Sequence, residues 1–117
     1  MNRRAIGNQG EDAACAYLKK QGWKVLDRNV IRRGGEIDII AEKKGVYAFI
    51  EVKTRSSNRY GTPAEAVDAR KQRRIALVAM QYAAEKKLLD ARLHFDVIEV
   101  TPEGVRHIEG AFNPPEM

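Results

Sequence analysis

The sequence has a single cysteine, no long hydrophobic run, and few prolines and glycines. Cys15 alone cannot form an internal disulfide or a cysteine zinc site, which favours a reducing compartment. The longest stretch without a charged residue, Ile75 to Ala84, has ten residues, about half of the roughly 20 that a membrane-spanning helix needs. The basic N-terminal residues are not followed by an apolar segment, so we expect a cytoplasmic protein with no membrane partner.

Other absences exclude several classes of catalytic and metal site. The sequence contains no Gly-rich phosphate loop, no serine nucleophile motif and no zinc signature. With four prolines and nine glycines in 117 residues, it is also neither collagen-like nor of low complexity. What it does contain is 44% hydrophobic and 32% charged residues, as expected of one autonomously folding domain over residues 1–117 with a loose tail at 110–117.

Periodicity predicts an α/β domain. Apolar residues recur at helical spacing after Asn8 and again after Ile75, and short β-branched runs lie between and behind these segments. The predicted elements are a helix at 8–21, strands at 23–29, 36–41 and 46–53, a helix from Thr62 to about Leu88 with a break near Asp68, and strands at 93–100 and 105–109. The long helix connects strands 46–53 and 93–100, which should therefore be parallel in a mixed central sheet flanked by helices.

The candidate chemistry lies in two neighbouring strands. Side chains alternate across a strand, so Asp38 can share one side of the hairpin with Glu51 and Lys53 if the register pairs Asp38 with Glu51 or Phe49. The two carboxylates would then lie about 4.5 to 8 Å apart. Such a pair needs a cation, and hard oxygen ligands suit Mg²⁺, with Mn²⁺ as a substitute. The alternative is a solvated Glu51–Lys53 ion pair of little energetic weight.

Glu11 is a third acidic candidate, because the apolar residues Ala14, Cys15 and Leu18 follow it on the same helical stripe. A carboxylate on the face toward the sheet either completes the site or bonds back to an N-cap at Asn8. Lys53 would orient a water or neutralise charge on a phosphate.

The modest charge excess, 21 − 16 = +5, permits a polyanionic partner. The basic candidates for nucleic-acid contact are Arg33, Arg55, Lys71 and Arg74, each of which can instead be a solvated surface residue.

Taken together, these residues resemble a known family. The segments that carry the resemblance run from about Gly7 to Val100 and are Gly10-Glu11, Gly35-Glu36-Ile37-Asp38, Glu51-Val52-Lys53-Thr54-Arg55, Gly61, Glu65-Ala66-Val67 and Lys71. They resemble the YraN-like family of small bacterial proteins, which is similar to the restriction-endonuclease-like, PD-(D/E)xK superfamily and, in layout, to archaeal Holliday-junction resolvases. The resemblance implies a restriction-endonuclease-like core with Asp38 and Glu51 as metal ligands, Lys53 as the catalytic lysine and Glu11 as a further site carboxylate.

The sequence thus predicts a Mg²⁺-dependent nuclease that hydrolyses DNA phosphodiesters, with branched or structured DNA as a candidate substrate. Two rival functions stay open. One is a nucleic-acid-binding or adaptor module that keeps the nuclease scaffold without chemistry, and the other is a protein-interaction role for the basic helix. Symmetric cutting of a junction would require a homodimer, which no apolar surface in the sequence identifies.

Overall fold

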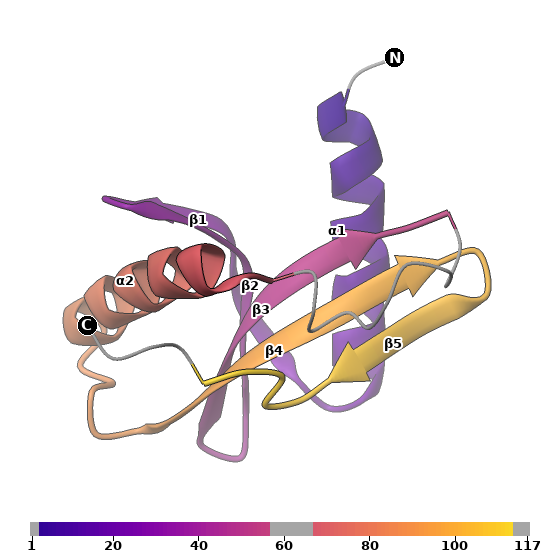
Figure 1. The fold of residues 1–117 in the computed structure, drawn as a ribbon. Coiled ribbons are helices and arrows are strands. Elements are labelled where there is room, and N and C mark those ends of the chain that lie inside the picture. The colour runs from indigo at the N-terminus through magenta and orange to yellow at the C-terminus, as the bar shows by residue number, and fades with distance from the viewer. Residues whose placement is uncertain (1–2, 57–66, 114–117) are drawn as a thin grey trace.

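The computed structural model describes residues 3–56 and 67–113. Within these residues the elements follow the predicted order: helix, three strands, helix, two strands (Figure 1). They are α1 (Arg3–Lys20), β1 (Lys24–Arg32), β2 (Gly35–Lys43), β3 (Val46–Thr54), α2 (Ala69–Glu85), β4 (Arg92–Thr101) and β5 (Gly104–Ile108). The predicted α/β class and element order are confirmed. No helix in the described part of the chain is both long and apolar enough to cross a membrane.

The five strands form one sheet in the order β1-β2-β3-β4-β5. β3 and β4 are parallel because the chain between them crosses over through α2, whereas the other neighbours are antiparallel. The predicted hairpin of β2 and β3 turns at Lys44-Gly45, where both residues have positive φ. The sheet is therefore mixed, as the sequence predicts.

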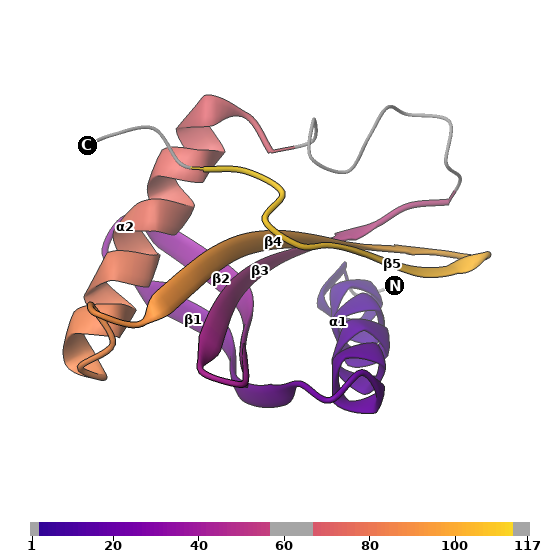
Figure 2. The ribbon, with the colours of Figure 1, turned by 90° about the horizontal axis from the view of Figure 1, so that it is seen from below.

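The two helices lie on opposite faces of the sheet (Figure 2). On one face Ile39, Ala48 and Ile50 pack with Ala14 and Leu18 of α1. On the other face, Ile40, Phe49 and Val97 pack with α2 through its buried residues Ile75, Val78, Ala79 and Tyr82. Both faces of the central strands are apolar, which explains why β2 and β3 read as continuous hydrophobic runs rather than as strict alternations.

Both helices begin elsewhere than the sequence predicts. α1 begins at Arg3, so Asn8 lies inside the helix and cannot cap it. The reason is that Arg3, Arg4 and Ala5 are good helix formers, which extend the helix toward the N-terminus. α2 begins after Asp68, whose carboxylate caps the helix by accepting the Lys71 N–H at 2.9 Å. The expected start of a helix near Asp68 is thus confirmed. The predicted capping box at Thr62 and Glu65 lies outside the described residues.

The tail expected to be loose from Gly110 is attached at its beginning. The Gly110 N–H donates to Asp96 Oδ1 at 2.8 Å, the Ala111 N–H donates to the Phe95 carbonyl at 2.8 Å, and the Phe112 ring stacks on Phe95. Asp96 is fully buried, and its other oxygen lies 2.8 Å from His107 Nε2. A buried carboxylate needs such partners, which is why residues 110–112 are held against the sheet.

Candidate active site

The site begins where β2 and β3 separate. Their pairing runs from Lys43–Val46 to Ile39–Ile50 and ends there, although β2 continues back to Gly35 and β3 continues to Thr54. Next to this fork the Val52 N–H donates to Asp38 Oδ2 at 2.8 Å, so a side chain replaces the strand partner. The same register, continued by one residue, places Asp38 opposite Glu51. The fork is thus the point at which both carboxylates meet.

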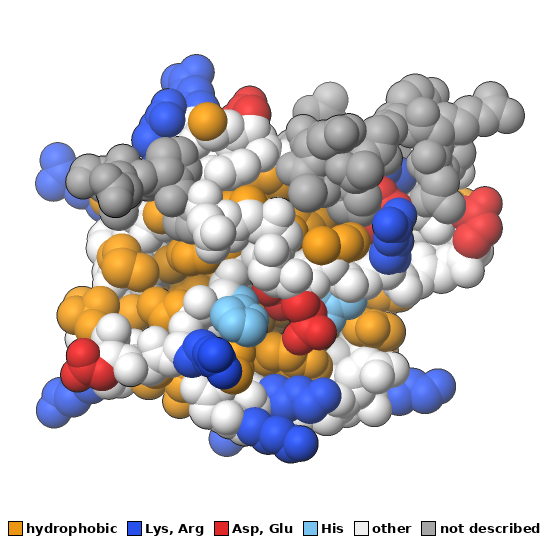
Figure 3. Space-filling model, turned by 60° about the horizontal axis from the view of Figure 1, so that its bottom comes forward, with side chains coloured by type: hydrophobic (Ala, Val, Ile, Leu, Met, Phe, Trp, Pro, Cys, Tyr) orange, Lys and Arg blue, Asp and Glu red, His pale blue; other side chains and the backbone are white. Residues whose placement is uncertain are grey.

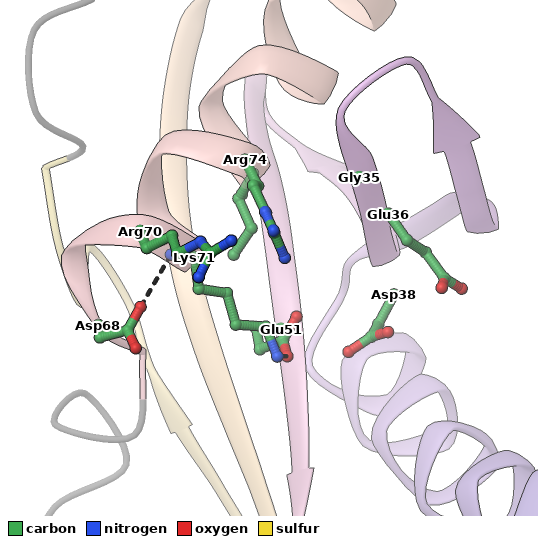
Figure 4. Close-up of a pocket in the computed structure, with 9 residues that line it drawn as sticks. Gly35, Glu36, Asp38, Glu51, Asp68, Arg70, Lys71 and Arg74 are labelled. Carbon is green, nitrogen blue, oxygen red and sulfur yellow. Dashed lines mark hydrogen bonds and ion pairs between the residues drawn. The ribbon is translucent and has the colours of Figure 1, made fainter.

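A pocket of about 510 Å³ opens at this fork, beneath the beginning of α2. Figure 4 shows the Asp38 carboxylate pointing across the gap toward Glu51, while Glu36 points away from it. The basic residues come from α2 and cover the side of the pocket opposite Asp38. The lining residues are Gly35, Glu36, Asp38, Glu51, Asp68, Arg70, Lys71, Arg74 and Ile75.

Asp38 and Glu51 are held close together in a poorly solvated place. The Glu51 side chain is only 7% exposed. Burial, and then the negative charge of Glu51, raise the pKa of Asp38 to about 7, against the opposing hydrogen bond from Val52. Two carboxylates in this arrangement are favourable as anions only if positive charge lies between or beside them. The pocket therefore suits a cation.

Two lysines supply positive charge to the same oxygen. Lys53 Nζ lies 3.4 Å and Lys71 Nζ 2.5 Å from Glu51 Oε1. Burial, followed by the bond to Lys71, lowers the pKa of Lys53. Burial is the largest effect on Lys71 and acts to lower its pKa, but the hydrogen bond and the charge of Glu51, together with smaller effects of Lys53 and Asp38, leave the pKa raised. The structure thus brings together Asp38, Glu51 and Lys53, as the sequence predicts, and adds Lys71.

Glu11 approaches the fork from α1. An added Cβ at the preceding residue, Gly10, would overlap Thr54 Oγ1, so glycine allows α1 to lie directly against the end of β3. Glu11 is 9% exposed, and burial raises its pKa against the opposing effect of Arg28, whose Nη2 lies 3.9 Å away. Its negative charge also raises the pKa of Asp38. Glu11 is therefore a neighbour of the carboxylate pair.

One oxygen of Glu11 is buried without a hydrogen-bond partner among the described residues, namely Oε1. The Asn29 side chain hydrogen-bonds to the Glu11 carboxylate and works to lower its pKa. Asn29 has φ 51°, in the left-handed region, although it lies inside β1. Its neighbours Arg28 and Val30 pair with Ile39 and Ile37, so Asn29 lies opposite Asp38. This non-Gly residue with positive φ therefore adjoins the fork.

The basic candidates fall into two groups. Lys71 and Arg74 line the pocket, with Arg74 reaching down from α2 toward Glu51 (Figure 4). Arg33 is exposed in the β1–β2 turn and is absent from the lining, and Arg55 pairs through Nε with the buried Glu99 at 3.5 Å. On the face shown in Figure 3, acidic and histidine side chains lie near the middle among hydrophobic ones, and Lys and Arg side chains lie mostly around them.

Sequence reasoning missed part of the site. Lys71 was expected to contact nucleic acid, whereas it also bonds to Glu51, and Asp68, Glu36 and Asn29 were not singled out for the site. A signal for Lys71 was available, because a helix that restarts at Asp68 places Lys71 in its first turn, next to the sheet. Asparagine is enriched at positive φ, but the predicted strand at 23–29 gives no further indication of such a conformation at Asn29.

The donors at the fork fit Mg²⁺ in part. Asp38 and Glu51 offer carboxylate oxygens, which Mg²⁺ prefers, and burial together with the negative charge of Glu51 raises the pKa of Asp38. Within residues 3–56 and 67–113, no three His, Cys, Asp or Glu side chains converge as a ready-made metal cluster.

Fold and pocket together define a class: an α/β protein with a five-stranded mixed sheet flanked by helices, and with acidic residues and lysines at the sheet fork. The chain belongs to the family described as "Uncharacterised protein family UPF0102", whose sequence model matches residues 10–100. The YraN-like resemblance is thereby confirmed.

Relatives of this family cover almost the whole chain. A UPF0102 protein of Geobacter metallireducens is 42% identical over 116 residues, covering 96% of this chain and 95% of the relative. UPF0102 protein STH1475 of Symbiobacterium thermophilum is 50% identical over 102 residues, covering 87% and 86%. Among solved structures, the crystal structure of SSO0001 matches with 18% identity and a TM-score of 0.47, over 95% of this chain and 52% of that one.

Proposed function

We propose that the protein is a Mg²⁺-dependent nuclease that hydrolyses DNA phosphodiester bonds. The observation that carries this proposal is that Asp38 and Glu51, which are 13 residues apart in sequence, face one pocket whose other side is formed by Arg70, Lys71 and Arg74. Carboxylates on one side and cations on the other are what a metal-assisted attack on a phosphate requires.

Asp38 and Glu51 would hold the metal. When bound, Mg²⁺ would supply a Lewis acid that polarises a phosphate oxygen and lowers the pKa of an attacking water. The chain itself contributes position and charge. The Val52 N–H fixes the Asp38 carboxylate, and Lys53, bonded to Glu51 at 3.4 Å, places a nitrogen at the edge of the same pocket. There it would orient the attacking water or stabilise charge on the phosphate in the transition state.

Glu11 and the basic residues of α2 would assist the metal ligands Asp38 and Glu51. Glu11 adds negative charge behind Asp38, and its Oε1 has no hydrogen-bond partner among the described residues, so Glu11 would tune or complete the cation site. Arg70 and Arg74 lie on the opposite side of the pocket, where their planar groups can contact phosphate oxygens in pairs. The scissile strand would therefore lie between α2 and the fork.

The test is cleavage by purified protein with Mg²⁺ or Mn²⁺ on single-stranded, duplex, flapped and four-way-junction DNA. We expect cutting of at least one substrate, with loss of roughly 100-fold or more in Asp38→Asn and Lys53→Met. Asp38→Asn keeps an oxygen for the Val52 N–H, so folding should survive. Glu103→Gln, an exposed change in the β4–β5 turn, is the matched control. Equal cutting by all variants would assign the activity to another site or to a contaminant.

One observation favours a second candidate, a nucleic-acid-binding module without chemistry. Lys53 and Lys71 already balance the charge of Glu51, so the site does not depend on a metal for neutrality. This alternative predicts salt-dependent binding that Lys71 and Arg74 substitutions weaken, no effect of divalent cations, and no cleavage of any substrate. A homodimer stays a prediction, and sedimentation of the protein with and without junction DNA would test it.

A further inference from the structure

Lys71 occupies the part of the site that a divalent cation would use. Its ammonium lies 2.5 Å from Glu51 Oε1, closer than Lys53 on the same oxygen. The Glu51 side chain is 7% exposed and fixed in β3, whereas Lys71 is 41% exposed and reaches in from the first turn of α2. A buried carboxylate requires a cation, and here a side chain that can leave supplies it.

A bound divalent cation and this ammonium exclude each other. Both need the Glu51 carboxylate, and two positive centres a few ångströms apart in a poorly solvated pocket repel strongly. Lysine has a flexible four-carbon stem, so its ammonium can move by rotamer changes without displacing α2. The helix itself is held by the Asp68 cap and by Ile75 and Val78 in the core, which keeps the base of Lys71 in place.

The place to which the ammonium would move is already basic. Arg70 and Arg74 line the same pocket on either side of Lys71 in the sequence, and both project from α2 over the fork (Figure 4). An ammonium released from Glu51 there adds a third positive charge to the side of the pocket that faces a phosphate. An anion at this side would in turn hold Lys71 away from Glu51.

We propose that Lys71 is a resident counter-cation of Glu51 that a divalent metal ion displaces, and that the displaced ammonium binds a phosphate of the nucleic acid. Metal and nucleic acid then assist each other's binding, because each favours the same position of Lys71. This inference rests on the proposed function, in that it takes Asp38 and Glu51 as the metal ligands. Lys71 is thus a positioning residue whose removal should strengthen metal binding while weakening the link between metal and DNA.

The first experiment is a calorimetric titration of the full chain with Mn²⁺ alone. We expect Lys71→Met to bind Mn²⁺ at least about five-fold more tightly than wild type, since the competitor is gone. Arg73→Met, which removes one charge from an exposed position outside the pocket, should stay within about two-fold, and Lys71→Arg should resemble wild type. If Lys71→Met does not unfold cooperatively, Lys71→Gln replaces it.

The outcomes separate the two proposals. Equal Mn²⁺ affinity in wild type and Lys71→Met overturns the displacement and leaves the proposed metal site standing. If neither wild type nor Lys71→Met binds Mn²⁺, both the proposed metal site and the displacement are overturned. Mn²⁺ binding by Lys71→Met alone supports the displacement in its strongest form.

The second experiment measures the link to nucleic acid, with Ca²⁺ as a cation that takes the same oxygen ligands. The anisotropy of a labelled single-stranded oligonucleotide is followed with and without Ca²⁺. We expect Ca²⁺ to raise the affinity of wild type and of Arg73→Met by the same factor, and to raise that of Lys71→Met by a factor at least about three-fold smaller. An equal factor in all three proteins overturns the transfer of the ammonium to the phosphate.

Discussion

At the scale of single residues, the fold opposes the ionisation of Asp38. Its pKa is raised from 3.8 to about 7, first by burial and then by Glu51. The folded protein therefore holds this proton more tightly than the unfolded chain does. Stability is lost as pH rises from about 4 to about 7 and stays at the lower level above that range. A carboxylate kept at this cost is typical of a site rather than of a structural core.

The first prediction concerns Asp38→Asn, which cannot ionise. The free energy of unfolding of the variant, relative to wild type, should be higher near pH 8 than near pH 5 by on the order of 1–3 kcal/mol. Urea unfolding without divalent cations measures it. Asp90→Asn, at an exposed position, is the matched control and should show a smaller change. A difference between Asp38→Asn and wild type that does not vary with pH contradicts the prediction.

Asn29 carries a second prediction, because it combines a left-handed backbone with a hydrogen bond to Glu11. Asn29→Gly keeps the backbone conformation accessible and removes only the amide, whereas Asn29→Ala removes the amide and adds strain. We expect the alanine variant to be less stable than the glycine variant by about 1 kcal/mol. Cleavage should be weakened in both. Wild-type cleavage by Asn29→Gly would mean that the amide does not position Glu11.

At the scale of elements, the contact between α1 and β3 depends on the absence of a side chain at Gly10. Gly10 costs a helix about 1 kcal/mol relative to alanine, yet an added Cβ there would overlap Thr54 Oγ1. We therefore expect Gly10→Ala to lower the free energy of unfolding by about 1–3 kcal/mol in the wild-type background. In a Thr54→Ala background, which removes the hydroxyl, the same change should instead be neutral or stabilise by up to about 1 kcal/mol.

A double-mutant cycle with urea unfolding measures this reversal of sign. If Gly10→Ala has the same effect in both backgrounds, the close approach of α1 to Thr54 does not limit the packing. Loss of cleavage in Gly10→Ala and its recovery in the double variant would further connect this contact to the placement of Glu11, the next residue along α1.

The helices and strands could be predicted from the sequence, because short β-branched runs, turn residues and the helical spacing of apolar residues are local signals. Strand alternation placed Asp38 near Glu51 on the condition that the hairpin register pairs Asp38 with Glu51 or Phe49, and the observed register, continued by one residue, meets this condition. The element ends were harder. Whether α1 begins at Arg3 or Asn8 depends on small propensity differences, and the separation of β2 from β3 at Asp38 depends on a side chain taking the Val52 N–H.

At the scale of the whole molecule, what the sequence could not supply is contact between distant segments. Lys71 meets Glu51 only because α2 begins where it does, and Arg55 turns to Glu99 because β3 and β4 are paired in register. His107 meets Asp96 because the β4–β5 register pairs His107 with Ile98. In each of these pairs, a partly buried polar group contacts a partner from a distant segment of the chain. The local sequence pattern does not predict such contacts.

The last prediction separates net charge from its arrangement. Arg70→Gln with Arg74→Gln and Lys19→Gln with Lys20→Gln each lower the net charge from +5 to 5 − 2 = +3. Only the first pair lines the pocket, whereas the second lies exposed at the end of α1. If DNA binds across the pocket, the first double variant should bind DNA more weakly than wild type. The slope of its log affinity against log salt concentration should also be smaller in magnitude than the wild-type slope by about 1–2. The second should keep the wild-type slope. Anisotropy of a labelled oligonucleotide over a salt series measures both, and equal loss in the two variants would mean that overall charge, not the rim of the pocket, governs binding.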